Sequence, residues 1–314
     1  MMNFKGHRVD RYLLTSVLGW GSSGTVYSAV DTKSNHSAQF AIKCIPMANL
    51  PRRLGIQLVM EITYQDALRG CPHVLALHDI LQEGPYIFLV LELCETDMFK
   101  SLKKGVYLGN DDLIRKAFLE VLDGISACHQ RRVFHRDLKP ENIMCKADGT
   151  GIRIGDFGMA THHRVSRDGE TGSGPYMSPG QSIVVDAHVN RTDRLRESWD
   201  GEDGYPYYSA PTDVWALGVT LFVLVTSYYP WKAALPTDEG FMAFLEDEDR
   251  LFHKFPISRK LNVLLKGIFH PYPKKRLSIP MIRQEILEMD TFYRWRQSRP
   301  SAPPVSKKAT FSDS

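Results

Sequence analysis

The sequence predicts an α+β fold of two lobes, a small β-rich lobe followed by a larger helical one. Up to Leu93, short runs of β-branched and aromatic residues alternate with turn residues, a pattern typical of an antiparallel sheet. After Leu93, apolar residues recur mainly at helical spacing. The chain has 314 residues, of which 43% are apolar and 24% charged, and this is enough for a substantial core. We therefore expect a cleft between two lobes.

The individual elements follow from periodicity and turn residues. Leu54, Leu58 and Ile62 share one helical face, so a single helix over 54–68 is expected to interrupt the strands. A later hairpin is expected over 142–156, where Asp148 and Gly149 supply the turn. The strands are expected over 11–20, 24–31, 39–45, 74–81 and 86–93, and the later helices over 112–130, 213–226, 259–269 and 280–288.

Composition excludes several classes of function. The 39 basic and 36 acidic side chains leave a formal charge of only +3, so a nucleic acid is not an expected partner. The five cysteines form no CxxC pair, which argues against a disulfide framework and a zinc site. Charged residues stand near the start, where a signal peptide needs an apolar run. We therefore expect a cytoplasmic or nuclear location, or both.

One charge-free stretch, residues 214–231, reaches the lower limit of a membrane-spanning helix. Thr220, Thr226 and Pro230 interrupt it, and Asp213 stands directly before it. A helix that is apolar on all sides also occurs in the middle of a large domain. We expect a buried helix and no membrane span.

Three glycines, Gly19, Gly21 and Gly24, form the motif G-x-G-x-x-G before Val26. Glycines let backbone amides approach phosphate oxygens closely. In a dinucleotide-binding fold a helix would follow Gly24, but the sequence TVYSAV predicts a strand, so the motif lies in a hairpin. Taken alone, the motif is more typical of an ordinary glycine-rich turn than of a phosphate-binding loop.

Lys43 lies in the next expected strand, among Ala41, Ile42 and Ile45. An ammonium in such surroundings needs an anionic partner, and Glu61 on the expected helix is the natural one. Held by that carboxylate, Lys43 could orient nucleotide phosphates. The alternative is an edge-strand lysine that serves only solubility.

The segment VFHRDLKPENIM, residues 133–144, gives the strongest signal of chemistry. Asp137 can accept a hydroxyl proton, Lys139 can neutralise a transferring phosphoryl group, and Asn142 can bind a metal ion through its side-chain oxygen. Asp156 follows in an Asp-Phe-Gly sequence and suits Mg²⁺ that bridges phosphates. Three reactive groups within six residues rarely arise on a merely solvated surface.

These motifs together resemble the eukaryotic serine/threonine protein kinases over residues 12–294. The resemblance implies a bilobal kinase fold, with lobes of about 12–93 and 94–294 around an ATP cleft. The tail over 295–314 is rich in Ser, Pro and Lys and poor in apolar residues, a composition that predicts disorder. The resemblance also implies that ATP lies beneath Gly19, Gly21, Gly24 and Val26, and that Lys43 pairs with Glu61. It further implies that Asp137 is the catalytic base and that Asn142 and Asp156 hold Mg²⁺.

The same resemblance implies the remaining contacts. The hinge after Leu91, from Glu92 to Cys94, would bind adenine through its backbone, with Ala41 and Met144 on either side of the ring and Asp97 near the ribose. Lys139 in HRDLKPEN and Ser173 in GSGPYMSP are typical of the serine/threonine class. ATP and protein substrates with Ser or Thr acceptors are the implied partners.

Arg136 usually receives an activation-loop phosphate in this family. The usual acceptor position falls near Gly169, so we hypothesise that Glu170 supplies a constitutive charge, with Ser166 and Thr171 as other candidate phosphorylation sites. Full activity of Glu170→Ala together with loss of activity in Thr171→Ala would contradict this hypothesis.

One segment departs from the family pattern. Asp213 resembles the aspartate that ties the catalytic loop, and Arg276 resembles an arginine that pairs with a glutamate after Ser178-Pro179, but position 180 is Gly. Omitting residues 180–196 would bring Glu197 to that place. We interpret this block of 17 residues as an insertion or a retained intron, and transcript sequencing distinguishes the two.

Two other functions compete with an active kinase. A pseudokinase scaffold would explain the distorted segment after Pro179, whereas a small-molecule kinase conflicts with HRDLKPEN and the match from Ser173 to Pro179. Asp97 and Glu141 could attract a basic residue upstream of the acceptor, although solvated carboxylates are the commoner case. The sequences around Ser178 and Asp213 also resemble a group of fungal kinases that control nutrient response and meiosis.

Overall fold

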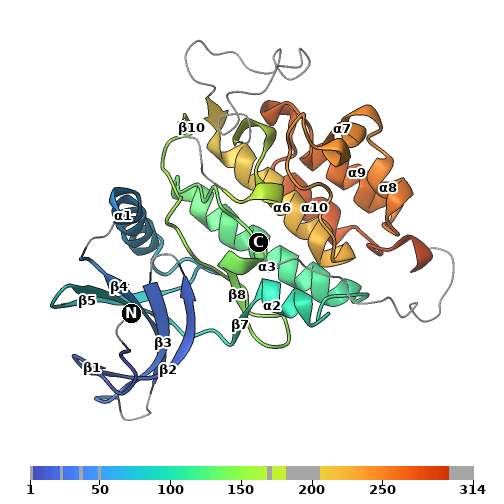
Figure 1. The fold of residues 1–314 in the computed structure, drawn as a ribbon. Helices are drawn as coiled ribbons and strands as arrows, with labels where there is room; N and C mark the ends of the chain where they lie inside the picture. Colours follow the sequence, from blue (N-terminus) through green and yellow to red (C-terminus); the bar gives the residue numbers. More distant parts are fainter. Residues whose placement is uncertain are drawn as a thin grey trace.

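The structure, a computed structural model, describes residues 3–21, 24–34, 38–48, 51–167, 172–181 and 206–296. Two lobes are evident in Figure 1, a small sheet-containing lobe in blue and a larger helical lobe in green to red. This is the two-lobed α+β arrangement that the sequence predicts.

Within its described residues, the small lobe contains one antiparallel sheet and one helix. The strand order is β1-β2-β3-β4-β6-β5, and helix α1 spans Arg52–Ala67. The strands are β1 Arg8–Val9, β2 Tyr12–Gly21, β3 Gly24–Asp31, β4 Gln39–Pro46, β5 Leu77–Glu83 and β6 Tyr86–Glu92. Four of the five expected strands are thus confirmed within two residues at each end, and β5 begins three residues later than expected.

Alternation along β4 decides which side chains reach α1. Ile42 and Cys44 join an aromatic cluster on one face of the sheet, which includes Tyr12, Tyr27 and Phe88. Ala41 and Ile45 pack with Leu58 of α1 on the other face. Because side chains in a strand alternate between faces, Lys43 lies on the same side as Ala41 and Ile45 and faces α1.

The large lobe is mainly helical. Figure 1 shows α3 and α6 in its middle, with the later helices to one side. The helices are α2 Met98–Lys103, α3 Asp111–Gln130, α6 Ser209–Thr226, α7 Glu239–Glu246, α8 Arg250–Lys254, α9 Arg259–Ile268 and α10 Ile279–Leu287, with 3-10 turns η1 Pro140–Asn142, η2 Gly174–Tyr176, η3 Pro273–Lys275 and η4 Arg294–Arg296. Short strands accompany them: β7 Thr96–Asp97, β8 Ile143–Cys145, β9 Arg153–Ile154, β10 Val165–Ser166 and β11 Tyr207–Tyr208.

Helix α6 forms the centre of the large lobe. It is long and apolar enough to cross a membrane, but 89% of it is buried inside the protein. Trp215 and Phe222, both fully buried, pack against residues of later helices. Ser227 ends the helix in the left-handed conformation, with its N–H bonded to the Val223 carbonyl. This confirms the expected buried helix.

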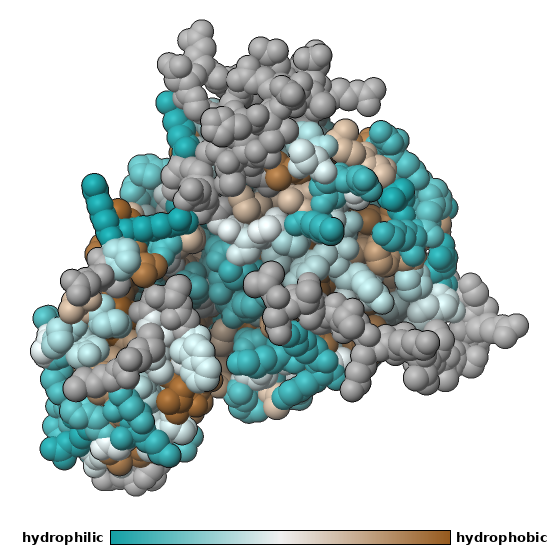
Figure 2. All heavy atoms as spheres, in the orientation of Figure 1, coloured by the Kyte–Doolittle hydropathy of each residue, from teal (hydrophilic) through white to brown (hydrophobic). Residues whose placement is uncertain are grey.

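The face of the molecule that Figure 2 shows is mostly hydrophilic, with apolar side chains in scattered patches.

Parts of three sequence hypotheses lie outside the described residues. Glu170 and Thr171 of the activation-loop hypothesis are outside, as are Glu197 and residues 297–314 of the tail. Of the block 180–196, Gly180 and Gln181 belong to the described structure and lie in a helical turn.

Candidate active site

A cleft of about 810 Å³ lies between the lobes. Its walls come from the β2–β3 hairpin, β4, α1, the chain after β6, and the loops around η1 and Asp156. The predicted site residues on these walls are Gly19, Gly24, Val26, Ala41, Lys43, Glu61, Leu91, Glu92, Cys94, Asp97, Lys139, Asn142, Met144, Asp156 and Ser173. Gly21 pairs with Gly24 across the hairpin, and Asp137 joins the site through hydrogen bonds to Lys139 and Ser173.

Gly19 and Gly24 both line the cleft, but the surroundings of the two glycines differ. Gly24 has a φ of +155°, and a Cβ there would lie 2.2 Å from the carbonyl oxygen of Cys44. Only glycine fits this approach of β3 to β4. At Gly19 a Cβ would meet nothing within 4 Å. Gly24 is therefore required by the sheet, whereas Gly19 leaves open space over the cleft.

Lys43 and Glu61 form the expected ion pair. The Lys43 Nζ donates to both carboxylate oxygens of Glu61 at 2.7 Å, and the two side chains are 15% and 7% exposed. Burial opposes the charge on Lys43, but Glu61 and Asp156 outweigh it and raise the Lys43 pKa. The ammonium therefore stays charged at neutral pH, at the wall of the cleft.

Asp137, Lys139 and Ser173 form a hydrogen-bonded group at the floor of the cleft. The Lys139 Nζ donates to Asp137 Oδ2 at 3.0 Å and to Ser173 Oγ at 2.6 Å. The Ser173 hydroxyl donates to Asp137 Oδ1 at 2.8 Å. Asn142 Nδ2 adds a bond to Oδ2 at 3.2 Å, so Oδ2 accepts two hydrogen bonds and Oδ1 one. Within the described structure, Oδ1 is thus the oxygen that keeps a lone pair for a further hydroxyl.

Asn142 and Asp156 have the chemistry that a magnesium site requires. Both hydrogen bonds of the Asn142 side chain use its nitrogen, to the Asp137 carbonyl at 2.9 Å and to Oδ2, which leaves its oxygen for a cation. Asp156 is exposed to the same cleft. Within the described ranges no three His, Cys, Asp or Glu side chains are grouped to hold a metal ion. Mg²⁺ commonly needs only one or two protein ligands besides phosphate oxygens and water.

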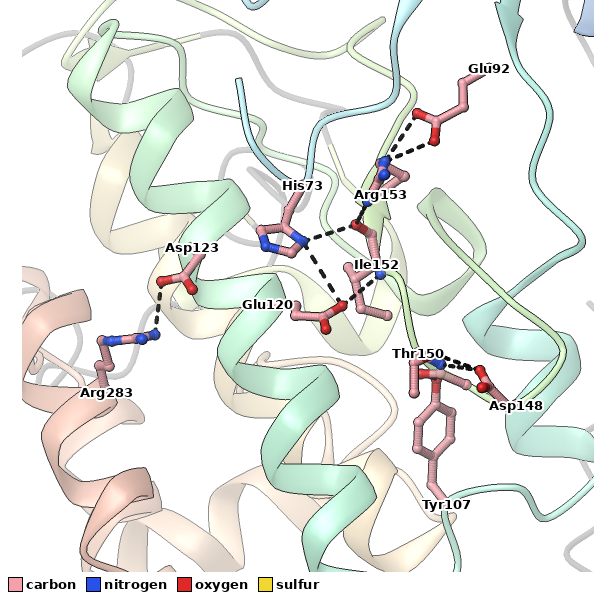
Figure 3. Close-up of polar contacts among 11 residues, drawn as sticks. His73, Glu92, Tyr107, Glu120, Asp123, Asp148, Thr150, Ile152, Arg153 and Arg283 are labelled. Carbon is pink, nitrogen blue, oxygen red and sulfur yellow. Dashed lines mark hydrogen bonds and ion pairs between the residues drawn. The ribbon is translucent and has the colours of Figure 1, made fainter. Parts of the chain in front are cut away.

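The hinge is fixed from outside the cleft. Arg153 of β9 donates to both Glu92 carboxylate oxygens, at 2.9 and 3.0 Å, as Figure 3 shows. The Glu92 side chain is thus held by Arg153, and the Glu92 N–H donates to the Ala76 carbonyl at 2.9 Å, which fixes the start of the hinge. The Cys94 pKa is raised to about 12, mainly by burial, so its thiol is neutral.

The backbone of the catalytic loop depends on Asp213 at the start of α6. Its carboxylate accepts hydrogen bonds from the backbone N–H groups of His135 at 2.9 Å and Arg136 at 2.7 Å. His129 Nε2 lies 2.7 Å from the same carboxylate. Asp213 is fully buried, and these contacts hold the loop that carries Asp137.

Arg276 lies against α6 and forms no ion pair with a carboxylate of the described residues. Its guanidinium donates to the carbonyls of Pro211 at 2.9 Å and His270 at 3.0 Å and stacks over the Trp215 ring. Burial lowers the Arg276 pKa to about 9. The expected partner, Glu197, lies outside the described residues.

The activation-loop start is anchored by a short sheet between β10 and β11. Ser166 is only 6% exposed, and its Oγ lies 3.1 Å from Ser209 Oγ. This burial makes Ser166 a poor phosphorylation site unless the segment opens.

Sequence reasoning missed several cleft residues. Leu18 and Leu75 contribute apolar walls, Trp20 lies at the roof, and Tyr229 lines the cleft beside Tyr176. Leu18 and Trp20 adjoin the glycine motif, and this place in the sequence could have predicted that they lie at the cleft. Nothing local marks Leu75 or Tyr229, because only the tertiary fold brings them to the cleft.

The comparison with family models decides the identity. A model described as "Protein kinase domain" matches residues 12–287. The chain belongs to the protein kinase family. The predicted kinase fold and family are thereby confirmed, and similar proteins whose names specify a class are serine/threonine kinases.

Several curated proteins are similar to this kinase. The "Negative regulator of sexual conjugation and meiosis" of Schizosaccharomyces pombe is 33% identical over 304 residues, which cover 95% of this chain and 64% of that protein. "CBL-interacting serine/threonine-protein kinase 17" of Arabidopsis thaliana is 33% identical, with 90% and 60% covered. "Serine/threonine-protein kinase VHS1" of Saccharomyces cerevisiae is 25% identical, with 98% and 76% covered. The chain thus spans less than two thirds of the first of these relatives.

Proposed function

We propose that this kinase transfers the γ-phosphate of ATP to Ser or Thr hydroxyls of protein substrates. The hydrogen-bonded group of Asp137, Lys139 and Ser173 beside the Lys43–Glu61 pair carries the proposal. A phosphoryl-transfer site needs a proton acceptor for the attacking hydroxyl and fixed cations for the phosphates. The described residues contain both, which favours an active enzyme over a pseudokinase scaffold.

Each residue has a role that follows from its contacts. Asp137 Oδ1, with its remaining lone pair, orients the substrate hydroxyl and accepts its proton as the oxygen attacks. Lys139 lies between Asp137 and Ser173, where its charge stabilises the phosphoryl group in transfer. Lys43, charged and fixed by Glu61, positions the other phosphates. When bound to Asn142 and Asp156, Mg²⁺ supplies further charge neutralisation of the phosphate oxygens.

Substrate preference depends on the acidic residues near the floor. Asp97 is already occupied, because it caps α2 through the Lys100 N–H and pairs with the Lys100 Nζ at 2.9 Å. Glu141 lines the cleft, and its Oε2 is buried and has no hydrogen-bond partner within the described structure. Of the two, Glu141 is the better candidate to bind a basic substrate residue.

We also propose a cytoplasmic or nuclear location, which the five cysteines without a CxxC pair and the charged residues near the start support.

The test is transfer of labelled phosphate from ATP to a basic acceptor protein, followed by phosphoamino-acid analysis. We expect label on Ser and Thr, dependence on Mg²⁺, and loss of labelling in Asp137→Ala. If the wild type binds MgATP but transfers no label to any acceptor, the chain is a scaffold rather than an enzyme.

A further inference from the structure

Arg136, directly before the catalytic base, has a strained backbone. Its φ is +64°, in the left-handed region that non-glycine residues avoid unless the surroundings hold them there. Because the peptide unit between Arg136 and Asp137 sets the direction of the Asp137 side chain, any group that fixes Arg136 also fixes the base.

Among the contacts of Arg136 within the described residues are four hydrogen bonds to other groups, and two of these come from Asp213 and from the loop at Met159. Asp213 accepts from its backbone N–H at 2.7 Å, and the Met159 carbonyl accepts from its Nε at 2.7 Å. The other two are Gln181 and Tyr207. They lie immediately before and shortly after residues 182–205, in the long connection that departs from the kinase pattern.

Gln181 holds the carbonyl side of Arg136. Its Nε2 donates to the Arg136 carbonyl oxygen at 3.0 Å, and its Oε1 accepts from the Ser178 N–H at 3.1 Å. The side chain is 1% exposed. Gly172 leaves room for this contact, because a Cβ there would lie 3.2 Å from both the Arg136 oxygen and Gln181 Nε2. Gln181 is therefore built into the catalytic loop.

Tyr207 holds the guanidinium side. Its hydroxyl accepts from Arg136 Nη1 at 3.0 Å, and the side chain is 1% exposed. The pairing of β11 with β10, with Ser166 opposite Tyr207, fixes the position of the ring.

We propose that Gln181 and Tyr207 are positioning residues for Asp137 and act on it through Arg136. The long connection between Pro179 and α6 is thus anchored at both ends on the catalytic loop. Gln181 therefore belongs to the working site and is not part of a dispensable block. The proposal rests on the proposed role of Asp137 as base.

Two conservative variants test it. Gln181→Glu keeps the size and the acceptor for Ser178 but loses the N–H that binds the Arg136 carbonyl. Tyr207→Phe removes only the hydroxyl. The matched controls are Gln130→Glu and Tyr208→Phe. Gln130 is exposed on α3. Tyr208 follows Tyr207 directly, and its ring lies beneath the Lys274 ammonium.

The expected result is a selective loss of kcat. Gln181→Glu should lower kcat by about tenfold or more, because a small displacement of a reacting group is costly, and Tyr207→Phe by about threefold to tenfold. KM for ATP should stay at its wild-type value in both variants, and both controls should match wild type. Tyr207→Phe should keep the wild-type unfolding temperature. Gln181→Glu buries a carboxylate beside the Arg136 carbonyl and should lower the unfolding temperature, so its kcat is measured well below that temperature. In an Asp137→Asn background neither variant should slow the residual rate further.

Unchanged kcat in both variants would overturn the proposal, and so would a loss that persists in the Asp137→Asn background. Amide hydrogen exchange over residues 133–142 gives a readout that does not need activity. Faster exchange in both variants supports the positioning role, and unchanged exchange refutes it. If the wild type transfers no phosphate, the proposed function fails, and hydrogen exchange alone then decides the positioning role.

Discussion

Lys43 and Glu61 show how a single residue acquires its chemistry from its surroundings. Strand alternation turns Lys43 toward α1, and Leu58 and Glu61, three residues apart, lie on one face of that helix. This pair could be predicted from sequence because both periodicities are local. The contacts of Arg136 could not, since Gln181 and Tyr207 reach it from far along the chain.

The first prediction separates the stability of this pair from its function. Lys43→Met should destabilise the protein by about 3 kcal/mol, because it leaves Glu61 buried without its partner. Burial already raises the Glu61 pKa against the opposing effect of Lys43. The double variant Lys43→Met/Glu61→Leu should recover most of that stability and still transfer no phosphate. Urea unfolding and the transfer assay measure the two effects, and a double variant no more stable than Lys43→Met would contradict this account.

The second prediction concerns pH and Asp213. Burial alone would raise the pKa of Asp213, but His129, His135 and the Arg136 N–H hold it below its usual value. A carboxyl with a lowered folded-state pKa stabilises the fold above its unfolded pKa of about 3.9, and this contribution is lost as the pH falls through the folded value.

Asp213→Asn should therefore lower the free energy of unfolding by about 3 kcal/mol at pH 7. The difference in this free energy between the variant and wild type should become smaller below about pH 5. Chemical unfolding at a series of pH values measures it. A gap that stays constant down to the acid limit of folding would show that the charge of Asp213 is not what stabilises the loop.

At the scale of elements, the strands and long helices could be predicted because their apolar periodicity continues over many residues. Helices α2, α7 and α8 were missed, since each has eight residues or fewer and too few turns to show a period. The start of α6 was placed four residues late, at Asp213, because Pro211 was not credited to a first helical turn.

The third prediction compares two glycines of the β2–β3 hairpin. Gly24→Ala should destabilise the protein by about 2 kcal/mol, since its Cβ would collide with the Cys44 carbonyl in β4. Gly19→Ala has open space, so stability should hold while KM for ATP rises. Thermal unfolding and ATP titration measure the pair, and equal destabilisation by both substitutions would rule out the distinction. The motif alone gives both glycines the same role in phosphate binding, and only the packing around each one shows that their roles differ.

At the scale of the molecule, each lobe supplies half of the site. The sheet and α1 provide Lys43 and Glu61, while the loops around α3 and α6 provide Asp137, Asn142 and Asp156. The two-lobed fold and the cleft could be predicted from the change of pattern at Leu93. The anchoring of the long connection could not, because it depends on contacts that no local pattern encodes.

The most direct test of the central claim is single-turnover transfer from pre-bound MgATP to a serine peptide, in wild type and in Asp137→Asn. The account predicts that both proteins bind MgATP equally well and that the variant transfers phosphate about 1,000-fold more slowly. Equal transfer rates in the two proteins would contradict the role of Asp137 as the catalytic base.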